Sequence, residues 1–553
     1  MHEPPISEYD TFAYPSALYA QTHPERLTTI AALTGLEAAP IASARVLELG
    51  CGDGNNLITM ACTLPGGEFH GFDLAKEPIR RGQEVIAALG LKNVKVRQMN
   101  ILEAPADLGT FDYIIAHGLY SWVPEAVREK ILAICRDHLA ENGVAYISYN
   151  AYPGNHLRDL ARRMMRFHVQ QFSQPPEQIR QARTFLKFLA EAKSKSGLWQ
   201  DVLKHQFERI EKYADAGFFH DDLSSMNQPF YFYEFMEAAA RHQLQFLSEA
   251  DIRDMQPNGL TEEALGVVHK MDQVNRVVRE QYLDFVAGRS FRQTLLCRQE
   301  CRLDREPKLV SVCNLFAAAD VTPVNPDANA AAPGMEDFQR GKAIIASGQP
   351  VLKSALAYLG QVWPRRVPFE ELLQKARERV LCSVPNSAGA AVAERAKAHT
   401  PGQSGSVEGD TLKRGHQTDE SDRRDLAELL VRCYAIGFVD LHSYASTFVS
   451  EISERPMASP LARLQIRRGE TVSSLRHLPL KVEDALGRSV LQLLDGTRDR
   501  AALLEELGKT VMSGATPIYS DGKPVEPQKA IEMLSTMLDT SLMSLARLGL
   551  LVG

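Results

Sequence analysis

A short apolar segment that runs directly into three closely spaced glycines constrains the fold of this chain more than any other feature. The segment reads VLELGCGDG and spans residues 46–54. Its residues Val46, Leu47 and Leu49 form an apolar run of the length typical of a buried parallel strand. Glycines after such a strand let the backbone turn sharply and lie against a ligand without an intervening side chain. We therefore predict a strand–loop–helix unit at the carboxyl edge of a parallel sheet, with a nucleotide-like cofactor over the loop.

The spacing of the glycines separates the candidate cofactors. The loop lacks the Gly-x-Gly-x-x-Gly pattern of dinucleotide sites and the Gly-Lys-Ser or Gly-Lys-Thr of phosphate-binding loops. It resembles motif I of the class I S-adenosylmethionine (AdoMet)-dependent methyltransferases, in which an acid, here Glu48, stands two residues before Gly-x-Gly-x-Gly. An acid is tolerable beside a cationic sulfonium, whereas it would repel a pyrophosphate. The alternative is a tight strand-to-helix turn without a ligand.

A second acid at the right distance supports this interpretation. The segment EFHGFDLA predicts a second strand that ends at Asp73, where one carboxylate can accept hydrogen bonds from both hydroxyls of a ribose. A third predicted strand, in NVKVRQMNIL, ends where the resemblance places the adenine ring. The predicted cofactor-binding residues are Glu48, Gly50, Cys51, Gly52, Gly54, Asn56, Asp73, Leu74, Asn100, Ile101 and His117.

The fourth and fifth predicted strands lead toward the acceptor side of such a site. FDYIIAHG ends where the resembled enzymes carry a substrate-facing motif, and residues 116–119 lack the proline-rich tetrapeptide that is frequent in amide and ring nitrogen methyltransferases. Trp122 follows, and it either lines the methyl-transfer channel or packs the fold. A capped helix is predicted to end at Gly143, before the fifth strand VAYISYN. That strand ends in polar and aromatic residues at the edge where α/β sheets bind ligands.

Two further stretches combine aromatic and charged side chains. The tyrosines before residue 20 either pack over the sheet or form a lid over a cationic ligand, and an amphipathic helix is predicted from about Glu25 to Leu36. The stretch GFFHDDLSSMNQPFYFYEF is either a helix cap with a packed aromatic loop or a cluster that binds an ammonium and accepts its proton. No single base stands out among the candidate acceptor-site residues Tyr14, Tyr120, Trp122, Tyr149, Tyr152, His220, Asp221 and Asp222.

Six motifs in order extend the resemblance over roughly the first 300 residues. They are YDTFAYPS, THPERL, LELGCGDG, YNAYPGN, HDDL with NQPFYFYEF, and FRQTLLCR. Together they resemble the bacterial class I methyltransferases with a methyltransferase regulatory domain, a group that includes rickettsial protein-lysine methyltransferases acting on an outer-membrane protein. The resemblance implies an α/β fold, with a Rossmann-like class I methyltransferase sheet and a helical insertion, followed by mainly helical, winged-helix-like carboxy-terminal domains. It does not transfer the substrate.

The chain of 553 residues is too long for one hydrophobic core. We predict the following parts: the first part of an AdoMet-binding core at 1–155, a helical insertion at 156–216, completion of the core with the regulatory region at 217–304, a winged-helix-like middle domain at 305–450, and a helical carboxy-terminal domain at 451–553. The small, polar composition of residues 384–422 predicts a flexible insertion within the middle domain. The helical insertion is expected to cover the substrate or to form a homodimer contact.

Composition excludes several functional classes. A net charge of −7 and an isoelectric point near 6.1 argue against a nucleic-acid partner. No apolar run is long enough for a membrane span and the first residues lack a signal-peptide pattern, so we expect a cytoplasmic protein. The eight cysteines include no Cys-x-x-Cys pair, so neither a metal site nor a disulfide framework is predicted.

The sequence thus predicts an AdoMet-dependent methyltransferase that acts on a protein, with lysine as the acceptor and an envelope protein as a candidate partner by resemblance. Carboxy-terminal modules without a catalytic constellation suit a macromolecular substrate better than a metabolite. Two alternatives stay open. One is a small-molecule methyltransferase whose extra domains close over the site, and the other is a non-catalytic AdoMet-binding scaffold or regulatory protein.

Overall fold

The chain folds into two compact units. The computed structural model describes residues 12, 14, 17–193, 197–257, 259–304, 307–327, 329–383, 408–520 and 523–553, and only the backbone of 408–419, 520, 523 and 524. The first unit comprises Met1–Leu27, Leu36–Arg302 and His477–Pro479. The second comprises Thr28–Gly35, Leu303–Arg476 and Leu480–Gly553. None of the helices described is both long and apolar enough to cross a membrane.

A seven-stranded sheet of the order β3-β2-β1-β4-β5-β7-β6 forms the centre of the first unit. Strands β1 to β5 run parallel, and β7 is antiparallel to both of its neighbours. The central strands β1 and β4 are apolar on both faces because helices cover both sides of the sheet. The Rossmann-like class I methyltransferase sheet is therefore confirmed. The strands are β1 Arg45–Leu49, β2 Glu68–Asp73, β3 Val94–Gln98, β4 Phe111–Ala116, β5 Leu139–Asn150, β6 Leu244–Glu249 and β7 Phe291–Arg298.

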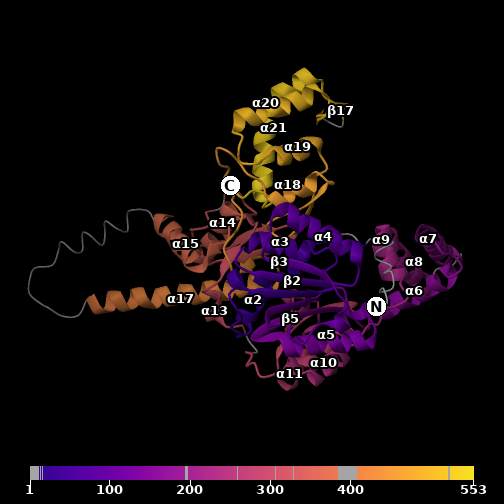
Figure 1. Cartoon of the computed structure of the whole chain (residues 1–553). Helices are drawn as coiled ribbons and strands as arrows, with labels where there is room; N and C mark the ends of the chain where they lie inside the picture. The colour runs from indigo at the N-terminus through magenta and orange to yellow at the C-terminus, as the bar shows by residue number, and fades with distance from the viewer. Residues whose placement is uncertain are drawn as a thin grey trace, which may run out of the picture. The chain divides into compact units, whose positions relative to one another are not determined.

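Figure 1 shows α3 and α4 on one face of this sheet and α5 and α10 on the other. The apolar residues on the second face form a continuous core that includes Phe111, Leu132 and Phe235. Helix α2 begins in the first unit, and its residues from Thr28 onward belong to the second unit. The helices of the first unit outside the insertion are α2 Pro24–Leu33, α3 Asn55–Thr63, α4 Lys76–Leu89, α5 Glu125–His138, α10 Phe232–Arg241, α11 Glu262–Val274 and α12 Arg276–Ala287.

Two predicted helix ends differ from the structure. Helix α5 ends at His138 rather than Gly143, because Leu139 is fully buried and already pairs with Phe111 of β4 as the first residue of β5. Helix α2 ends at Leu33 rather than Leu36. The chain turns directly after α2, where Gly35 has a φ of 80°.

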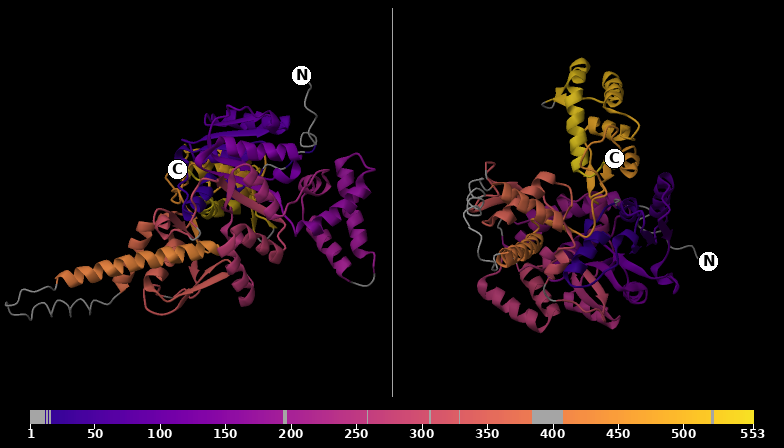
Figure 2. Two further views of the ribbon diagram at one scale, coloured as in Figure 1. Left: turned by 90° about the horizontal axis from the view of Figure 1, so that it is seen from below. Right: turned by 90° about the vertical axis from the view of Figure 1, so that its left-hand side faces the viewer.

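The predicted helical insertion is present and leaves the sheet at the end of β5. It consists of α6 Asn155–Val169, α7 Pro175–Glu191, α8 Leu198–Glu211 and α9 Asp215–Phe218, followed by the π-helical turn η5 Phe219–Leu223. Its helices bury an apolar core of their own, to which Met165, Leu186 and Leu203 contribute. Figure 2 shows this bundle standing out from the sheet.

The second unit contains two small antiparallel sheets and two groups of helices. The strand orders of these sheets are β11-β10-β9 and β12-β8-β13. Their strands are β8 Phe316–Ala318, β9 Thr322–Pro323, β10 Glu336–Arg340, β11 Ala343–Ser347, β12 Val367–Pro368 and β13 Asp440–His442. The first helices are α13 Leu309–Val312, α14 Pro350–Val362, α15 Phe369–Ser383 and α17 Glu408–Ala435. Of the predicted flexible segment 384–422, residues 384–407 lie outside the described residues. Residues 408–422 belong to helix α17.

The last hundred residues form a module with a separate hydrophobic core, to which Val490, Leu507 and Leu538 contribute. Two small antiparallel hairpins accompany its helices. The elements are α18 Pro460–Ile466, β14 Thr471–Ser473, β15 Pro479–Lys481, α19 Ala485–Leu493, α20 Arg500–Met512, β16 Tyr519–Ser520, β17 Lys523–Pro524 and α21 Pro527–Arg547.

Candidate active site

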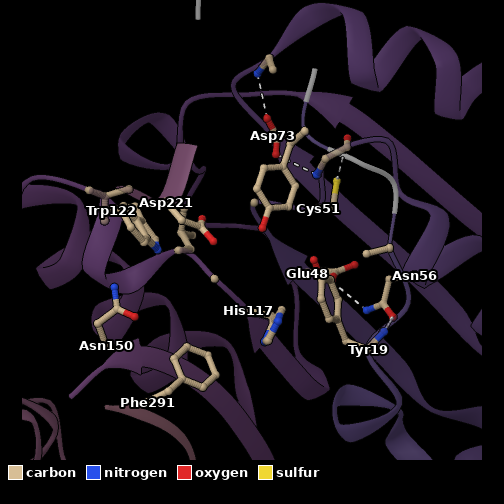
Figure 3. Close-up of a pocket in the computed structure, with 18 of the residues that line it drawn as sticks. Tyr19, Glu48, Cys51, Asn56, Asp73, His117, Trp122, Asn150, Asp221 and Phe291 are labelled. Atoms are coloured by element: carbon tan, nitrogen blue, oxygen red, sulfur yellow. Dashed lines mark hydrogen bonds between the residues drawn. The ribbon is translucent and has the colours of Figure 1, made fainter. Parts of the chain in front are cut away.

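A cavity of about 1050 Å³ opens at the carboxyl edge of the sheet in the first unit. The ends of β1, β2, β4 and β5 contribute to its walls, together with the amino-terminal segment and the helical insertion. In Figure 3, Glu48, Asn56 and Tyr19 lie at one end of this space, and Trp122 and Asp221 lie at the other. The site therefore brings together residues that lie far apart in the sequence.

The glycine loop adopts a backbone conformation that side chains would obstruct. Gly54, which precedes α3, has a φ of 73°, and a Cβ atom there would lie 2.7 Å from Cγ1 of Val96. Gly52 has a φ of 58° and open space in front of it. The loop consequently presents bare backbone to the cavity, as a site for a closely approaching ligand requires.

Asp73 fixes the second side of the loop. Its Oδ2 atom accepts a hydrogen bond of 2.8 Å from the backbone N–H of Gly52, and its Oδ1 atom accepts one of 2.8 Å from that of Ala75. The carboxylate is thereby held at the cavity wall at the end of β2. Leu74, Met99 and Ile101 line the adjoining wall and provide an apolar slot for a planar ring.

Glu48 has one satisfied and one orphaned oxygen. Its Oε1 atom accepts a hydrogen bond of 2.9 Å from Nδ2 of Asn56, whereas its buried Oε2 atom has no hydrogen-bond partner among the described residues. Burial raises the pKa of Glu48 to about 8. A cationic group in the cavity would supply the missing donor and stabilise the charged form. The orphaned oxygen, the open glycine loop and the fixed carboxylate of Asp73 thus fit AdoMet, which carries an ammonium, a sulfonium and a ribose.

His117 and Tyr19 form an uncharged wall beside Glu48. The Nδ1 atom of His117 lies 2.9 Å from Oη of Tyr146 and 3.1 Å from Oγ of Ser148. The ring centroids of Tyr19 and His117 are 3.9 Å apart. Burial lowers the pKa of His117 to about 4 and raises that of Tyr19 to about 12, so both side chains are neutral at physiological pH.

The three charged residues of the HDDL stretch have three different environments. Both carboxylate oxygens of the fully buried Asp222 accept hydrogen bonds from Arg158 and from Arg209. Asp221 lines the cavity instead, and burial raises its pKa to about 6. His220 lies behind this wall, where its Nε2 atom is 2.6 Å from the carbonyl oxygen of Phe12. The stretch forms a π-helical turn, so the helix cap that was one of the two alternatives is not present among these described residues.

Most of the predicted site residues line the cavity. Those that do so are Tyr14, Glu48, Gly50, Cys51, Gly52, Asn56, Asp73, Leu74, Asn100, Ile101, His117, Trp122 and Asp221. Cavity-lining residues that the sequence analysis did not assign to the site include Tyr19, Asn150, Arg158, Arg209 and Phe291. Asn150 and Phe291 belong to recognised motifs and Tyr19 belongs to the aromatic amino-terminal segment, whereas the two arginines lie on charged helix faces that carry no distinguishing signal.

The other predicted site residues lie outside the cavity lining for physical reasons. Tyr120 and Tyr149 are buried in the core under the sheet, where Tyr149 stacks on Phe235 at 4.2 Å between ring centroids. Tyr152 stacks on His156 and donates a hydrogen bond of 3.2 Å to Oδ2 of Asp159. His220 and Asp222 are buried behind Asp221, and Gly54 turns the chain into α3. The side chains of Tyr120, Tyr149 and Tyr152 pack against other parts of the first unit.

The fold and the cavity define a class I AdoMet-dependent methyltransferase. Three family models match the chain: a methyltransferase domain at residues 42–215, a predicted methyltransferase regulatory domain at 214–298, and the PKMT carboxy-terminal winged helix domain at 454–550. The chain belongs to the family of AdoMet-dependent methyltransferases with a methyltransferase regulatory domain. The winged-helix match falls on the last module and confirms the expectation of mainly helical, winged-helix-like carboxy-terminal domains.

Similar proteins come from Rickettsia. The uncharacterized protein RP789 of Rickettsia prowazekii is 28% identical over 533 residues, which cover 95% of this chain and 89% of that protein. The uncharacterized protein RP028 of the same organism is 36% identical over 43% of this chain and 96% of its own length. The structure of PKMT2 from Rickettsia typhi is 25% identical, with a TM-score of 0.81 over 98% of this chain and 100% of that chain. The same protein in complex with AdoHcy gives the same TM-score at 24% identity.

Proposed function

We propose that this methyltransferase transfers the methyl group to the side-chain amine of lysine residues in a protein substrate. One observation carries the proposal: the carboxylate of Asp221 lines the cavity on the side of the insertion, and the aromatic side chains of Tyr14 and Trp122 line it as well. Carboxylates and aromatic faces are the groups that bind an ammonium. The similarity to PKMT2 and the match to the PKMT winged helix domain support the same acceptor class.

The cofactor half of the site is assigned to residues at the ends of β1, β2 and β3. We assign the ribose hydroxyls to Asp73, the adenine ring to the slot at Asn100 and Ile101, and the cationic amino acid part to Glu48 and the neutral wall at His117. AdoMet supplies a methyl group on a positively charged sulfur, which an uncharged amine displaces. The protein therefore has to align the two partners and to present the amine without its proton.

Asp221 is the proposed proton acceptor. The unperturbed pKa of lysine is about 10.4, so the acceptor enters the site as an ammonium. With a pKa of about 6, Asp221 is ionised at neutral pH and can bind this ammonium before it accepts the proton. The neutral imidazole of His117 and the aromatic wall add no charge that would hold the amine in its protonated form.

We further propose a cytoplasmic protein that acts on an envelope protein before export, and a homodimer formed through the helical insertion. The insertion supports the dimer because it exposes Phe167, Phe188 and Leu198, with 73%, 62% and 84% of their surfaces accessible. Sedimentation of the wild type and of Phe188→Lys tests this part. An equally heavy species for both proteins at micromolar concentration would reject the assigned contact.

The methyl acceptor is tested with tritiated AdoMet and denatured cell-envelope protein. The wild type is expected to place label in acid-insoluble material that yields methylated lysine on hydrolysis, and Asp221→Asn to do so at least tenfold more slowly. Label confined to a soluble small molecule would favour the metabolite alternative. Cofactor binding by calorimetry without transfer to either fraction would favour the non-catalytic scaffold.

A further inference from the structure

We infer that Arg158 and Arg209 of the helical insertion are positioning residues that keep the carboxylate of Asp221 free for the amine of the acceptor. The inference rests on the proposed function, because it assigns the insertion a part in the same acceptor site. It concerns the division of roles between two consecutive aspartates and two arginines from different helices.

The two arginines form a clamp around Asp222 alone. From α6, Nε and Nη2 of Arg158 donate hydrogen bonds of 3.0 and 3.2 Å to the two carboxylate oxygens of Asp222. From α8, Nη2 and Nη1 of Arg209 donate bonds of 2.6 and 3.2 Å to the same two oxygens. Each carboxylate oxygen thus accepts one bond from each guanidinium, so the carboxylate of Asp222 is saturated by planar, bidentate pairs.

In the part of the chain that the structure describes, the carboxylate of Asp221 accepts no hydrogen bond of this kind from the same arginines. Its carboxylate Oδ2 atom is 4.0 Å from Nη2 of Arg158, and the hydrogen bond of 3.2 Å from that nitrogen goes to the backbone carbonyl of Asp221. The side chain of Asp221 is 23% exposed and lines the cavity, whereas that of Asp222 is fully buried. The clamp therefore holds the backbone of Asp221 while its carboxylate is left to face a ligand.

The clamp also prevents a competing arrangement. Both arginines line the cavity, and a guanidinium that paired with Asp221 would block the position of an ammonium. Because Asp222 uses donors of both arginines, neither group can turn to Asp221 without breaking buried, charge-assisted bonds. Without the charge of Asp222, Asp221 is the nearest carboxylate to Arg158.

Several other titratable groups belong to the surroundings of Asp221. His205 on α8, Tyr213 just after α8, and Tyr14 on the amino-terminal segment line the same cavity, and the charge of Asp221 acts on Tyr19. Of these groups, Tyr213 also contacts the clamp, with its ring centroid 5.6 Å from Cζ of Arg209. The charges that act directly on Asp221 are those of Arg158, Asp222 and Arg209.

The test compares Arg209→Gln and Asp222→Asn, which change the charge beside Asp221 in opposite directions. Methyl transfer from tritiated AdoMet to denatured envelope protein is measured from pH 5 to 9. Removal of Arg209 takes away a positive charge, so the acidic limb of kcat/KM should move to higher pH. Removal of the negative charge of Asp222 should move the limb to lower pH, with kcat/KM at neutral pH about tenfold lower, because Arg158 then engages Asp221.

Three controls separate positioning from a loss of structure. Arg209→Lys keeps the charge and should leave the limb near its wild-type position. Arg180→Gln on α7 removes an exposed arginine whose partner is Glu177, and should match the wild type. AdoMet binding by calorimetry should stay within twofold in every variant, since the clamp does not reach the glycine loop. If Asp222→Asn loses AdoMet binding, its structure is disturbed. The acidic limbs of kcat/KM in Arg209→Gln and Arg209→Lys then decide the result.

A binding measurement keeps this inference distinct from the proposed function. The probe is n-butylammonium, which has the shape of the end of a lysine side chain, added to the AdoHcy complex and followed by NMR line broadening. Binding should weaken at least fivefold in Asp222→Asn, in which Arg158 can engage Asp221, and stay near the wild-type value in Arg209→Lys, even if no envelope protein is methylated. Limbs that move in the same direction or not at all would overturn the inference, as would equal butylammonium binding in all variants.

Discussion

At the scale of single residues, Glu48 couples cofactor binding to pH. Burial raises its pKa to about 8, so its carboxyl group is largely protonated at neutral pH in the cofactor-free protein. The cationic part of AdoMet favours the ionised form, so binding below pH 8 must release a proton. We predict that the AdoMet affinity rises between pH 5.5 and 7.5, by at most about tenfold per pH unit. Calorimetry in two buffers of different ionisation enthalpy measures the proton directly.

The matched variant for this prediction is Glu48→Gln, which keeps the shape and the acceptor for Asn56 but cannot titrate. It should bind AdoMet more weakly and with a nearly flat pH dependence over the same range. A wild-type pH slope that persists in Glu48→Gln would assign the proton to another group.

Asp73 provides a second prediction at this scale. Asp73→Asn removes the charge that a ribose diol would meet and weakens the bonds to the N–H groups of Gly52 and Ala75. Hydrogen bonds to a charged group contribute roughly 1.5–3 kcal/mol each, so we expect a loss in AdoMet affinity of about 10- to 100-fold by calorimetry. Asp107→Asn, on an exposed residue, is the charge-matched control. Equal affinities for the two variants would remove Asp73 from the cofactor site.

At the scale of elements, β7 depends on one buried cation. Arg292 is fully buried and makes ion pairs with Glu249 of β6 and with Glu280 and Asp284 of α12. Its guanidinium also lies 3.8 Å from the ring centroid of Phe232. The cluster joins the last two strands of the sheet to the helix that precedes β7.

Arg292→Met is expected to lower the free energy of unfolding of the first unit by about 3–5 kcal/mol, because it leaves buried carboxylates without their cation. The measurement is urea denaturation followed by circular dichroism. Arg97→Met, on an exposed position of β3, is the control and should change the value by less than about 0.5 kcal/mol. A small effect for Arg292 would mean that Arg279 and Arg289 compensate the carboxylates.

The elements that the sequence predicted best are those with a local signal. The strand–loop–helix unit and the acid after β2 are recognisable because glycine spacing and strand length are local properties. Helix α5 was extended to Gly143 because periodicity does not reveal that Leu139 pairs with Phe111 across the sheet. Boundaries of this kind are decided by tertiary contacts between distant segments.

In the candidate acceptor site, too, the sequence predicts local features but not those that depend on tertiary contacts. The sequence marked the HDDL stretch but gave no means to separate its aspartates, because burial and the two arginines decide their roles. Arg158 lies 64 positions before Asp222, and Arg209 lies 13 before it, on helices whose charged faces look alike in sequence. The sequence gives no means to distinguish Tyr14 from Tyr120, Tyr149 and Tyr152, because all four are tyrosines in aromatic stretches. Packing places the last three outside the cavity lining.

At the scale of the whole molecule, the chain has separate hydrophobic cores. One lies under the sheet of the first unit, and another lies in the carboxy-terminal module of the second. We therefore predict at least two unfolding transitions in calorimetry. AdoMet should raise the midpoint temperature of only one of them, because the cavity belongs to the first unit. At a concentration of 100 times Kd, the cofactor should add about 2.7 kcal/mol to that transition.

A single transition that shifts as a whole with AdoMet would contradict this expectation, because it would show that both units unfold cooperatively. Glu48→Gln offers an internal check, since weaker cofactor binding should shrink the shift of the sensitive transition and leave the other unchanged. Fluorescence of the tryptophans assists the assignment, with Trp122 and Trp199 in the first unit and Trp363 in the second.

The insertion leaves the sheet after β5 and returns before α10, so the chain between those two points is a continuous block of sequence. Cofactor residues lie before this block, whereas Asp221 and its clamp lie inside it. Recombination at the two junctions would therefore replace half of a substrate site without altering the donor site. In evolutionary terms, an ancestral methyltransferase could acquire new acceptors by exchanging one contiguous cassette, and chimaeras of related enzymes joined at these junctions are the natural design for redirecting the methyl group.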